Sequence, residues 1–266
     1  MTEAERQGAL DAIGAEVATC TRCRLHETRT KAVPGEGSAA TEVVFVGEGP
    51  GLNEDRSGRP FVGQAGTLLT ELLGSVGWTR EEVFITNVVK CRPPGNRDPE
   101  ADEIAACAPF LSRQLAALDP ALVVTLGRFS MARFNPGARI GQVHGTFQPA
   151  DPASGSPDSL AFAMYHPAAA LHQGQLKATL FRDMASVPTA LLQARERRNS
   201  GSISPRQADI AAQPEPEATT APAAQASPGE GPVEEVPPVA TNESAAAAQS
   251  IELTPQTDPT DQLTLF

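Results

Sequence analysis

The chain has 266 residues and a formal net charge of -11, a balance that would exclude a nucleic-acid partner if it were spread evenly along the sequence. The negative charge is instead concentrated at the C-terminal end. From residue 199 onward there are ten acidic residues and ten prolines, against one basic residue, Arg206, and one aromatic residue, Phe266. Such a segment cannot bury enough apolar surface to offset its chain entropy, so we expect a disordered C-terminal tail.

Residues 1–198 are therefore predicted to form one folded domain. Without the tail, 20 basic and 22 acidic residues remain, a net charge of -2 that is compatible with DNA binding through local basic patches. No apolar run approaches the roughly 18 residues that cross a membrane, so we expect a cytoplasmic protein. In that reducing compartment cysteines are expected to be metal ligands or reactive thiols.

Strand and helix signals alternate along the folded part. Short apolar runs predict buried parallel strands at residues 43–46, 83–86, 122–126 and 162–164. Helices are predicted at residues 65–76, from an Asp98 cap with Pro99 to residue 118, and after Gly127. This alternation predicts an α/β class, three-layer α/β/α domain around a central four-stranded, mainly parallel sheet, with ligands at the carboxyl ends of the strands.

The four cysteines form two groups. Cys20 and Cys23 make a CxxC pair, and Cys91 and Cys107 lie sixteen positions apart, the second within the helix predicted to start at Asp98. Because every cysteine belongs to this set, we expect one shared metal site rather than unrelated buried thiols. Four thiolates suit a [4Fe-4S] cluster and a tetrahedral zinc ion equally well, so the pattern alone leaves the metal open.

A glycine-rich segment, GEGPGLNED at residues 47–55, follows the first predicted strand, and GRPFVG occupies residues 58–63. A glycine-rich turn after a strand brings the backbone close to a ligand. One interpretation is a dinucleotide-binding turn. The spacing fits neither GxGxxG nor the P-loop, and the prolines would disrupt a phosphate-binding loop, so we favour another ligand.

Two further motifs follow predicted strands: NVVKCRPPGNRDP at residues 87–99 and the turn His166-Pro167. Together with the cysteine spacing, GEGPG and GRPFVG, they resemble the family 4, thermostable-type uracil-DNA glycosylases, which carry an iron-sulfur cluster. The resemblance runs from about residue 20 to about residue 187. It implies a base-excision repair enzyme that flips uracil out of single- or double-stranded DNA, hydrolyses its N-glycosidic bond and leaves an abasic site. It also implies a [4Fe-4S] cluster on the four cysteines.

The resemblance implies roles for three residues, and each agrees with the chemistry of its side chain. Phe61 would stack on the flipped base, although an aromatic residue here is otherwise explained by core packing. Asn87 carries a donor and an acceptor that match O4 and N3-H of uracil and mismatch the amino group of cytosine. His166 would donate to uracil O2, where negative charge develops as the bond breaks.

The first loop is expected to line the substrate pocket through Gly47, Glu48 and Gly49. Water that attacks the sugar carbon must be oriented, and in better-known uracil glycosylases an aspartate of this loop does so. The equivalent position here is Gly49. Glu48 and Glu54 are the candidate replacements, with Asn96 a weaker one, although loop carboxylates are commonly just solvated. Glu48 is also a candidate to exclude the thymine methyl group.

The same loops carry basic residues, which are expected to contact DNA phosphates or, alternatively, to be solvated surface charges. Residues 168–171, after the His-Pro turn, are predicted to be the wedge that fills the space left by the flipped base. The predicted phosphate contacts are Arg59, Lys90, Arg92 and Arg97.

The chain ends with DQLTLF at residues 261–266, which resembles the bacterial sliding-clamp-binding peptide. Leu265 and Phe266 would fill a hydrophobic pocket beside Gln262 and Leu263, while residues 199–260 act as a flexible linker. We therefore expect the clamp as a partner of a nucleoid-associated bacterial protein. Nothing in the sequence suggests an obligate oligomer, so we expect a monomer.

Two other functions remain open. One is a protein that captures uracil-DNA without turnover, as a related iron-sulfur branch does through a histidine in a basic insert. The corresponding residues here, 92–97, contain no histidine, which disfavours capture. The other is a metal-bound scaffold that delivers partners to the clamp.

Overall fold

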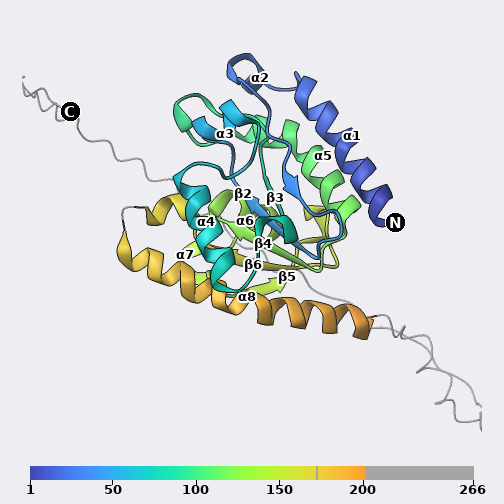
Figure 1. Cartoon of the computed structure of the whole chain (residues 1–266), viewed down its shortest axis with the longest axis vertical. Coiled ribbons are helices and arrows are strands. Elements are labelled where there is room, and N and C mark those ends of the chain that lie inside the picture. The colour runs from blue at the N-terminus through green and yellow to red at the C-terminus, as the bar shows by residue number, and fades with distance from the viewer. Residues whose placement is uncertain (172, 202–266) are drawn as a thin grey trace, which may run out of the picture. The chain divides into compact units, whose positions relative to one another are not determined.

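A six-stranded sheet forms the centre of the domain (Figure 1). The structure is a computed structural model that describes residues 1–171 and 173–201. Four strands run parallel in the order β3-β2-β4-β6, and a short antiparallel strand flanks each side, β1 beside β3 and β5 beside β6. In chain order the strands are β1 (Glu36–Gly37), β2 (Val43–Gly47), β3 (Phe84–Asn87), β4 (Leu122–Leu126), β5 (Phe147–Pro149) and β6 (Leu160–Met164).

The four predicted parallel strands are confirmed, and the predicted count of four is corrected to six. Both additional strands lie at the edges of the sheet and are two and three residues long. Neither contains an apolar run, because each pairs with a neighbour on one side only and is partly exposed. A pattern search for buried strands therefore misses them.

Helices cover both faces of the sheet, which confirms the three-layer prediction. Along β2, Val43 and Phe45 face a core formed with α4 (Gln64–Ser75) and α8 (Gly174–Gly201). Their neighbours Val44 and Val46 face the opposite core. That second layer contains α1 (Glu3–Thr19), α5 (Ala101–Leu118) and α6 (Arg128–Phe134), and Figure 1 shows α1 lying alongside α5.

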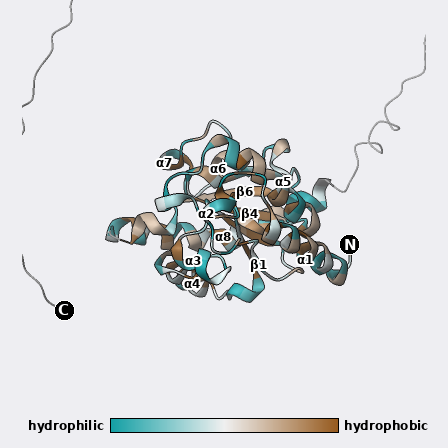
Figure 2. Ribbon diagram, turned by 90° about the horizontal axis from the view of Figure 1, so that it is seen from above, coloured by the Kyte–Doolittle hydropathy of each residue, from teal (hydrophilic) through white to brown (hydrophobic). Residues whose placement is uncertain are grey.

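Hydrophobic ribbon segments concentrate around β4 and β6 at the centre of the domain, and hydrophilic ones lie toward its outside (Figure 2). Shorter helices occupy the loops at the ends of the strands. They are α2 (Leu25–Thr28), α3 (Leu52–Ser57), η1 (Arg80–Glu82), η2 (Pro94–Asn96), α7 (Ile140–Val143), η3 (Pro152–Ser154) and η4 (Pro167–Ala170).

The start of α5 differs from the prediction. The helix begins at Ala101 rather than at the Asp98-Pro99 pair, and Glu100 is its N-cap. The carboxylate of Glu103 accepts a hydrogen bond from the Glu100 N-H over 2.8 Å, so a glutamate three positions into the helix satisfies the first free donor. Residues 98 and 99 therefore belong to the loop that follows β3.

The C-terminal helix α8 was not predicted, and it runs to Gly201, three residues beyond the predicted domain boundary at residue 198. The predictions of a disordered linker and a clamp-binding peptide otherwise concern residues 202–266, which lie outside the described residues. Within the described part of the chain, no helix has the length and apolarity needed to cross a membrane.

The carboxyl ends of the parallel strands bring the predicted site residues together. Gly47 at the end of β2 pairs with Asn87 at the end of β3. The pairing continues into the loops, where Val88 and Val89 donate to the carbonyls of Gly47 and Glu48, each over 3.0 Å. The loop after β2 is thus held against the loop after β3, where the site forms.

Candidate active site

Gly47 allows two other residues to meet at the end of β2. A Cβ atom on Gly47 would lie 2.4 Å from Oδ1 of Asn87 and 2.5 Å from Cζ of Phe61. Both distances are far shorter than van der Waals contact, so any side chain here would displace the amide or the ring. Glycine at this position is therefore required for the arrangement of Asn87 and Phe61.

Phe61 adopts a backbone conformation that non-glycine residues rarely take, with φ of 52°. Arg80 donates to the Phe61 carbonyl over 2.9 Å, and the same carbonyl lies 1.9 Å from where a Cβ of Gly66 would be. The Phe61 ring stacks on the ring of His166 with centroids 5.6 Å apart. Strain of this kind, of order 1–3 kcal/mol, persists where surrounding contacts fix a functional side chain.

Asn87 is almost completely buried, with 1% of its surface exposed. Its Oδ1 is buried and has no hydrogen-bond partner within the described residues. A buried acceptor left unpaired costs about 1–3 kcal/mol, so such atoms are rare unless a ligand completes them. Asn87 lines a cavity in the described part of the chain, where a bound ligand would supply the missing donor.

His166 lies two residues beyond the end of β6 and caps η4. The Ala168 N-H donates to Nδ1 of His166 over 3.1 Å. Burial lowers the pKa of His166 to about 4, and the negative charge of Glu54 opposes the shift only in part. The ring is therefore neutral at pH 7, and because Nδ1 accepts, its single proton is on Nε2.

One cavity of about 350 Å³ unites most of the predicted site. It is formed by the loops after β2, β3 and β6 together with the start of α4, and its volume suits a single nucleobase with space at the mouth. It is lined by Glu48, Gly49, Pro50, Gly51, Glu54, Phe61, Ala65, Asn87, Pro93, Asn96, Arg97, His166, Ala168 and Ala169.

The two cavity carboxylates differ in how they are bonded. Glu54 accepts three backbone hydrogen bonds, from Gly51 over 3.1 Å and from Val62 and Gly63 over 2.8 Å each. The side chain of Glu48 has no hydrogen bond or ion pair within the described residues. Burial raises the pKa of Glu48, and the neighbouring charge of Asp98 raises it further. Glu54 thus braces two loops, while Glu48 retains a free carboxyl group.

The predicted DNA-contacting residues do not share one environment. Arg59 is exposed and pairs with Glu36 over 2.8 Å, and Arg92 donates to Asn96 over 2.7 Å. The prediction for Lys90 is wrong, because its side chain is 1% exposed and its ammonium group is hydrogen-bonded inside the domain. It cannot reach a phosphate.

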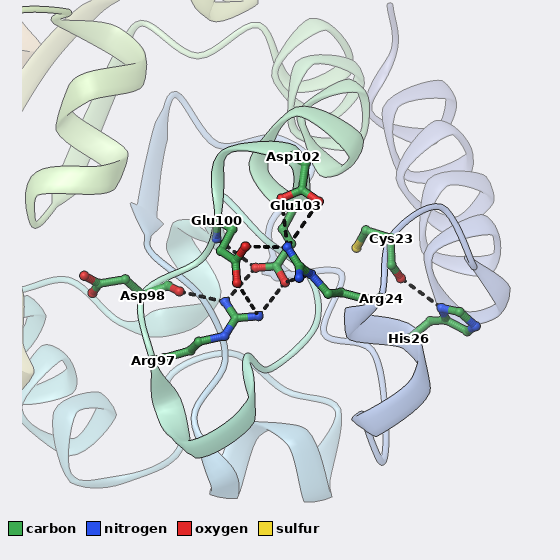
Figure 3. Close-up of polar contacts among 8 residues, drawn as sticks. All are labelled: Cys23, Arg24, His26, Arg97, Asp98, Glu100, Asp102 and Glu103. Atoms are coloured by element: carbon green, nitrogen blue, oxygen red, sulfur yellow. Dashed lines mark hydrogen bonds and ion pairs between the residues drawn. The ribbon is translucent and has the colours of Figure 1, made fainter.

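Arg97 lines the cavity and is held by a buried carboxylate (Figure 3). Glu103 accepts from its two terminal nitrogens over 2.6 and 2.9 Å, a bidentate geometry, and also accepts from Arg24 over 3.1 Å. Arg97 lowers the pKa of Glu103 to about 2. Because Arg24 follows Cys23 in the chain, this network connects the cysteine loop to the cavity wall.

The four cysteines are free thiols that line a second, smaller cavity between α1, the loop after β3 and α5. Arg29 donates to Sγ of Cys91 over 3.1 Å, and the Lys90 backbone N-H donates to Sγ of Cys107 over 3.2 Å. Within the described residues no three potential ligands are close enough together to hold one metal ion. Four thiol donors suit a metal centre that prefers sulfur.

Arg80, Gly66 and Glu103 also shape the site, and inspection of the sequence missed all three. Arg80 holds the Phe61 carbonyl, Gly66 leaves room for it, and Glu103 orients Arg97. No local sequence pattern marks these contacts, which join residues up to 19 positions apart. The predicted wedge, residues 168–171, begins on the cavity wall with Ala168 and Ala169 and ends at the exposed Leu171.

A stacked aromatic ring, an asparagine acceptor without a partner among the described residues and a neutral histidine meet at the carboxyl edge of a parallel sheet, a combination that suits a planar, hydrogen-bonding base. The sequence model of the Uracil DNA glycosylase superfamily matches residues 34–185. The chain is 47% identical over 188 residues to a type-4 uracil-DNA glycosylase of Saccharolobus solfataricus, which covers 68% of this chain and 86% of the relative.

Other relatives agree. A type-4 uracil-DNA glycosylase of Archaeoglobus fulgidus is 47% identical over 174 residues, covering 64% of this chain and 86% of the relative. One from Thermotoga maritima is 50% identical over 135 residues, covering 51% of this chain and 70% of the relative. The chain belongs to the type-4 uracil-DNA glycosylases, a family of hydrolases within that superfamily.

Proposed function

We propose that the protein releases uracil from DNA by hydrolysis of the N-glycosidic bond, on both single- and double-stranded substrates, and leaves an abasic site for base-excision repair. One observation supports this most directly: Oδ1 of Asn87 is buried without a partner among the described residues, and Asn87 lines a cavity whose volume fits one base. An acceptor in this position pairs with N3-H of uracil, while its amide nitrogen donates to O4. Cytosine, with an unprotonated N3 and an amino group at C4, reverses both contacts.

The aromatic ring and the histidine complete the pocket. The Phe61 ring offers a stacking surface worth about 1–3 kcal/mol per base. His166 presents its Nε2-H as a neutral donor, because Nδ1 is already occupied by the Ala168 N-H. As the glycosidic bond breaks, the electron pair moves onto the uracil ring, and a hydrogen bond from His166 to O2 strengthens as that charge develops.

Glu48 is the best candidate to orient the attacking water. Its carboxyl group lines the cavity and has no partner within the described residues, whereas the oxygens of Glu54 are occupied by three backbone donors. Gly49 has no side chain to supply a carboxylate, and a Cβ there would lie 2.7 Å from Cγ2 of Val89. We therefore assign Glu54 to positioning and Glu48 to water activation.

The cysteine site is proposed to hold a [4Fe-4S] cluster through Cys20, Cys23, Cys91 and Cys107. Its support is the set of four thiols around one cavity and the hydrogen bonds to two of the sulfur atoms. When bound, the cluster would supply cross-links between α1, the loop after β3 and α5. No step proposed above transfers an electron, so its contribution is to hold the loop that carries Asn87 and Arg97.

DNA contact is proposed to involve Arg97, which lines the cavity, together with Arg92 on the same loop and Arg59 on the loop that carries Phe61. Residues 261–266 are proposed to bind the sliding clamp. Deleting them should leave uracil release from short oligonucleotides unchanged and abolish clamp binding, measured by surface plasmon resonance.

The proposed activity is tested with oligonucleotides that carry one uracil, single-stranded or opposite guanine or adenine. We expect free uracil and alkali-labile sites in molar excess over enzyme, together with bound iron and visible absorption. Asn87→Ala and His166→Ala should each reduce the rate severely while the circular dichroism spectrum is kept. A stable protein-DNA adduct would indicate capture instead, and the absence of both adduct and release would leave the scaffold hypothesis.

A further inference from the structure

Lys90 has surroundings that its predicted role in DNA binding does not explain. Its side chain is among the largest that are fully buried in the described residues, and it has no ion pair with a carboxylate there. Removing an unpaired ammonium group from water is costly, so a lysine is rarely kept in such a place without a specific contact. The buried ammonium group of Lys90 is therefore expected to have a specific contact.

The hydrogen bonds of Lys90 identify its charge state and one of its targets. Nζ lies 2.8 Å from the Asn87 carbonyl, 2.7 Å from Oε1 of Gln114 and 2.6 Å from Oγ1 of Thr86. The first two atoms only accept. The Thr86 hydroxyl donates to the Pro34 carbonyl over 2.9 Å, so toward Nζ it accepts as well. Three acceptors require three N-H donors, which only the ammonium form provides.

The same lysine is adjacent to the cysteine site. Lys90 lines the cavity that the four thiols share, and its backbone N-H donates to Sγ of Cys107. Thiolates bound to metal would be anionic, and they would balance a positive charge that has no carboxylate partner within the described residues. Lys90 thus lies between the thiols and the carbonyl of Asn87.

We infer that Lys90 is a positioning residue for uracil recognition: its ammonium group fixes the main chain of Asn87, and the thiolates of the cysteine site balance its charge. This inference rests on the proposed function and deepens it, because it explains how a remote metal centre supports base selection. Displacing the Asn87 backbone would tilt the amide away from N3-H and O4, and misplacement by about 1 Å can reduce a rate about a hundredfold.

The test compares the iron-loaded protein with Lys90→Met, which keeps the length of the side chain and removes the charge and all three donors. We expect kcat/KM for uracil-DNA and the affinity for free uracil, measured by competition, both to fall roughly 10- to 100-fold. The midpoint potential of the metal centre should become more negative, because a nearby positive charge stabilises the reduced state.

Leu115→Ala is the matched control for lost stability. Leu115 is buried, follows Gln114 in α5, and has no hydrogen bond with Asn87. This variant should melt earlier than the wild type but retain its affinity for uracil and its midpoint potential. Equal losses of uracil affinity in Lys90→Met and Leu115→Ala would reduce Lys90 to a structural role and overturn the inference.

Lys90→Gln serves as a second variant if Lys90→Met does not fold. Its amide is neutral but still donates, so the potential should shift while uracil affinity is better preserved than in Lys90→Met. A Lys90→Gln variant with the wild-type midpoint potential and the wild-type affinity for uracil would contradict the inference. If the wild-type protein binds no metal, the proposal that metal-bound thiolates balance the charge of Lys90 is overturned. Wild-type protein that releases no uracil would instead refute the proposed function, so the two failures are distinguishable.

Discussion

The Ala168 N-H donates to Nδ1 of His166 over 3.1 Å, which places the ring proton on Nε2. Because burial lowers the pKa of this histidine to about 4, the ring is a neutral donor across the physiological range. In the proposed reaction a neutral ring would stabilise charge on uracil O2 without giving up a proton, and the backbone of η4 would select the tautomer that this requires.

Replacing Ala168 with proline removes that N-H. We expect Ala168→Pro to reduce the single-turnover rate of uracil release roughly tenfold, because the tautomer and orientation of His166 are no longer fixed. Ala168→Gly keeps the N-H and is the matched control. Similar rates in the proline and glycine variants would show that the hydrogen bond does not select the tautomer.

The pH dependence of the rate should report Glu48 rather than His166. A water-activating carboxylate must be ionised, and burial raises the pKa of Glu48, so activity should begin to fall at a higher pH than for an exposed glutamate at about 4.3. In the slower Glu48→Gln enzyme this acid limb should disappear, leaving a level rate down to about pH 5.

Rates measured from pH 9 to 5 on both proteins would check this assignment. An inflection near 6.5 in both would contradict it, because that value belongs to an ordinary exposed histidine. The two pKa shifts act in opposite directions. A raised pKa of Glu48 means that the carboxylate is protonated, and activity lost, at a higher pH. A lowered pKa of His166 means that its ring stays neutral down to a lower pH.

Two glycines of α4 provide a paired test of the Phe61 geometry. In Gly66→Ala the new Cβ would lie 1.9 Å from the Phe61 carbonyl, so the strained turn must move. We expect a loss of stability of about 1–3 kcal/mol and a weaker affinity for uracil. A Cβ at Gly74 meets nothing within 4 Å, so Gly74→Ala should instead stabilise the protein by about 0.5–1 kcal/mol.

Thermal melting and competition by free uracil distinguish the two variants. Normal uracil affinity in Gly66→Ala would show that the turn at Phe61 tolerates displacement and that its conformation is unimportant for binding the base.

Glu54→Gln should behave as a loop mutation. The amide can accept through one oxygen only, so at least one of the bonds from Gly51, Val62 and Gly63 is lost, at about 1.5–3 kcal/mol for a hydrogen bond to a charged group. We expect KM to rise and the melting temperature to fall, with kcat less affected than in Glu48→Gln. A normal melting temperature with a severe loss of kcat would reassign water activation to Glu54.

The parts of the molecule that depend on short stretches of sequence were predictable. The four buried strands appear as apolar runs, and Gly47, Asn87 and His166 occur where those runs end. The edge strands were missed because two or three paired residues produce no periodic pattern. The start of α5 was placed at Asp98 because an aspartate before proline is a common helix start, yet Glu100 forms the cap.

Side-chain environment was less predictable, because it depends on partners that are remote in the chain. In charge and position Lys90 resembles the loop arginines. Its burial depends on acceptors from Thr86 and from Gln114, which lies 24 positions later in the chain. Glu54 looks like a free loop carboxylate, and its partners Val62 and Gly63 come eight and nine residues later. Neither partner set is marked by a local pattern.

By itself the sequence determined the layered α/β architecture and the family, because both are recorded in local periodicity or in ordered motifs, and it supplied the candidate cysteine ligands and base-binding residues. Only the tertiary structure decided which charged groups are free to act. Burial and hydrogen bonding arise when distant segments pack, and they assign Glu48 to the open cavity, Glu54 to the loops and Lys90 to the space between the thiols and Asn87.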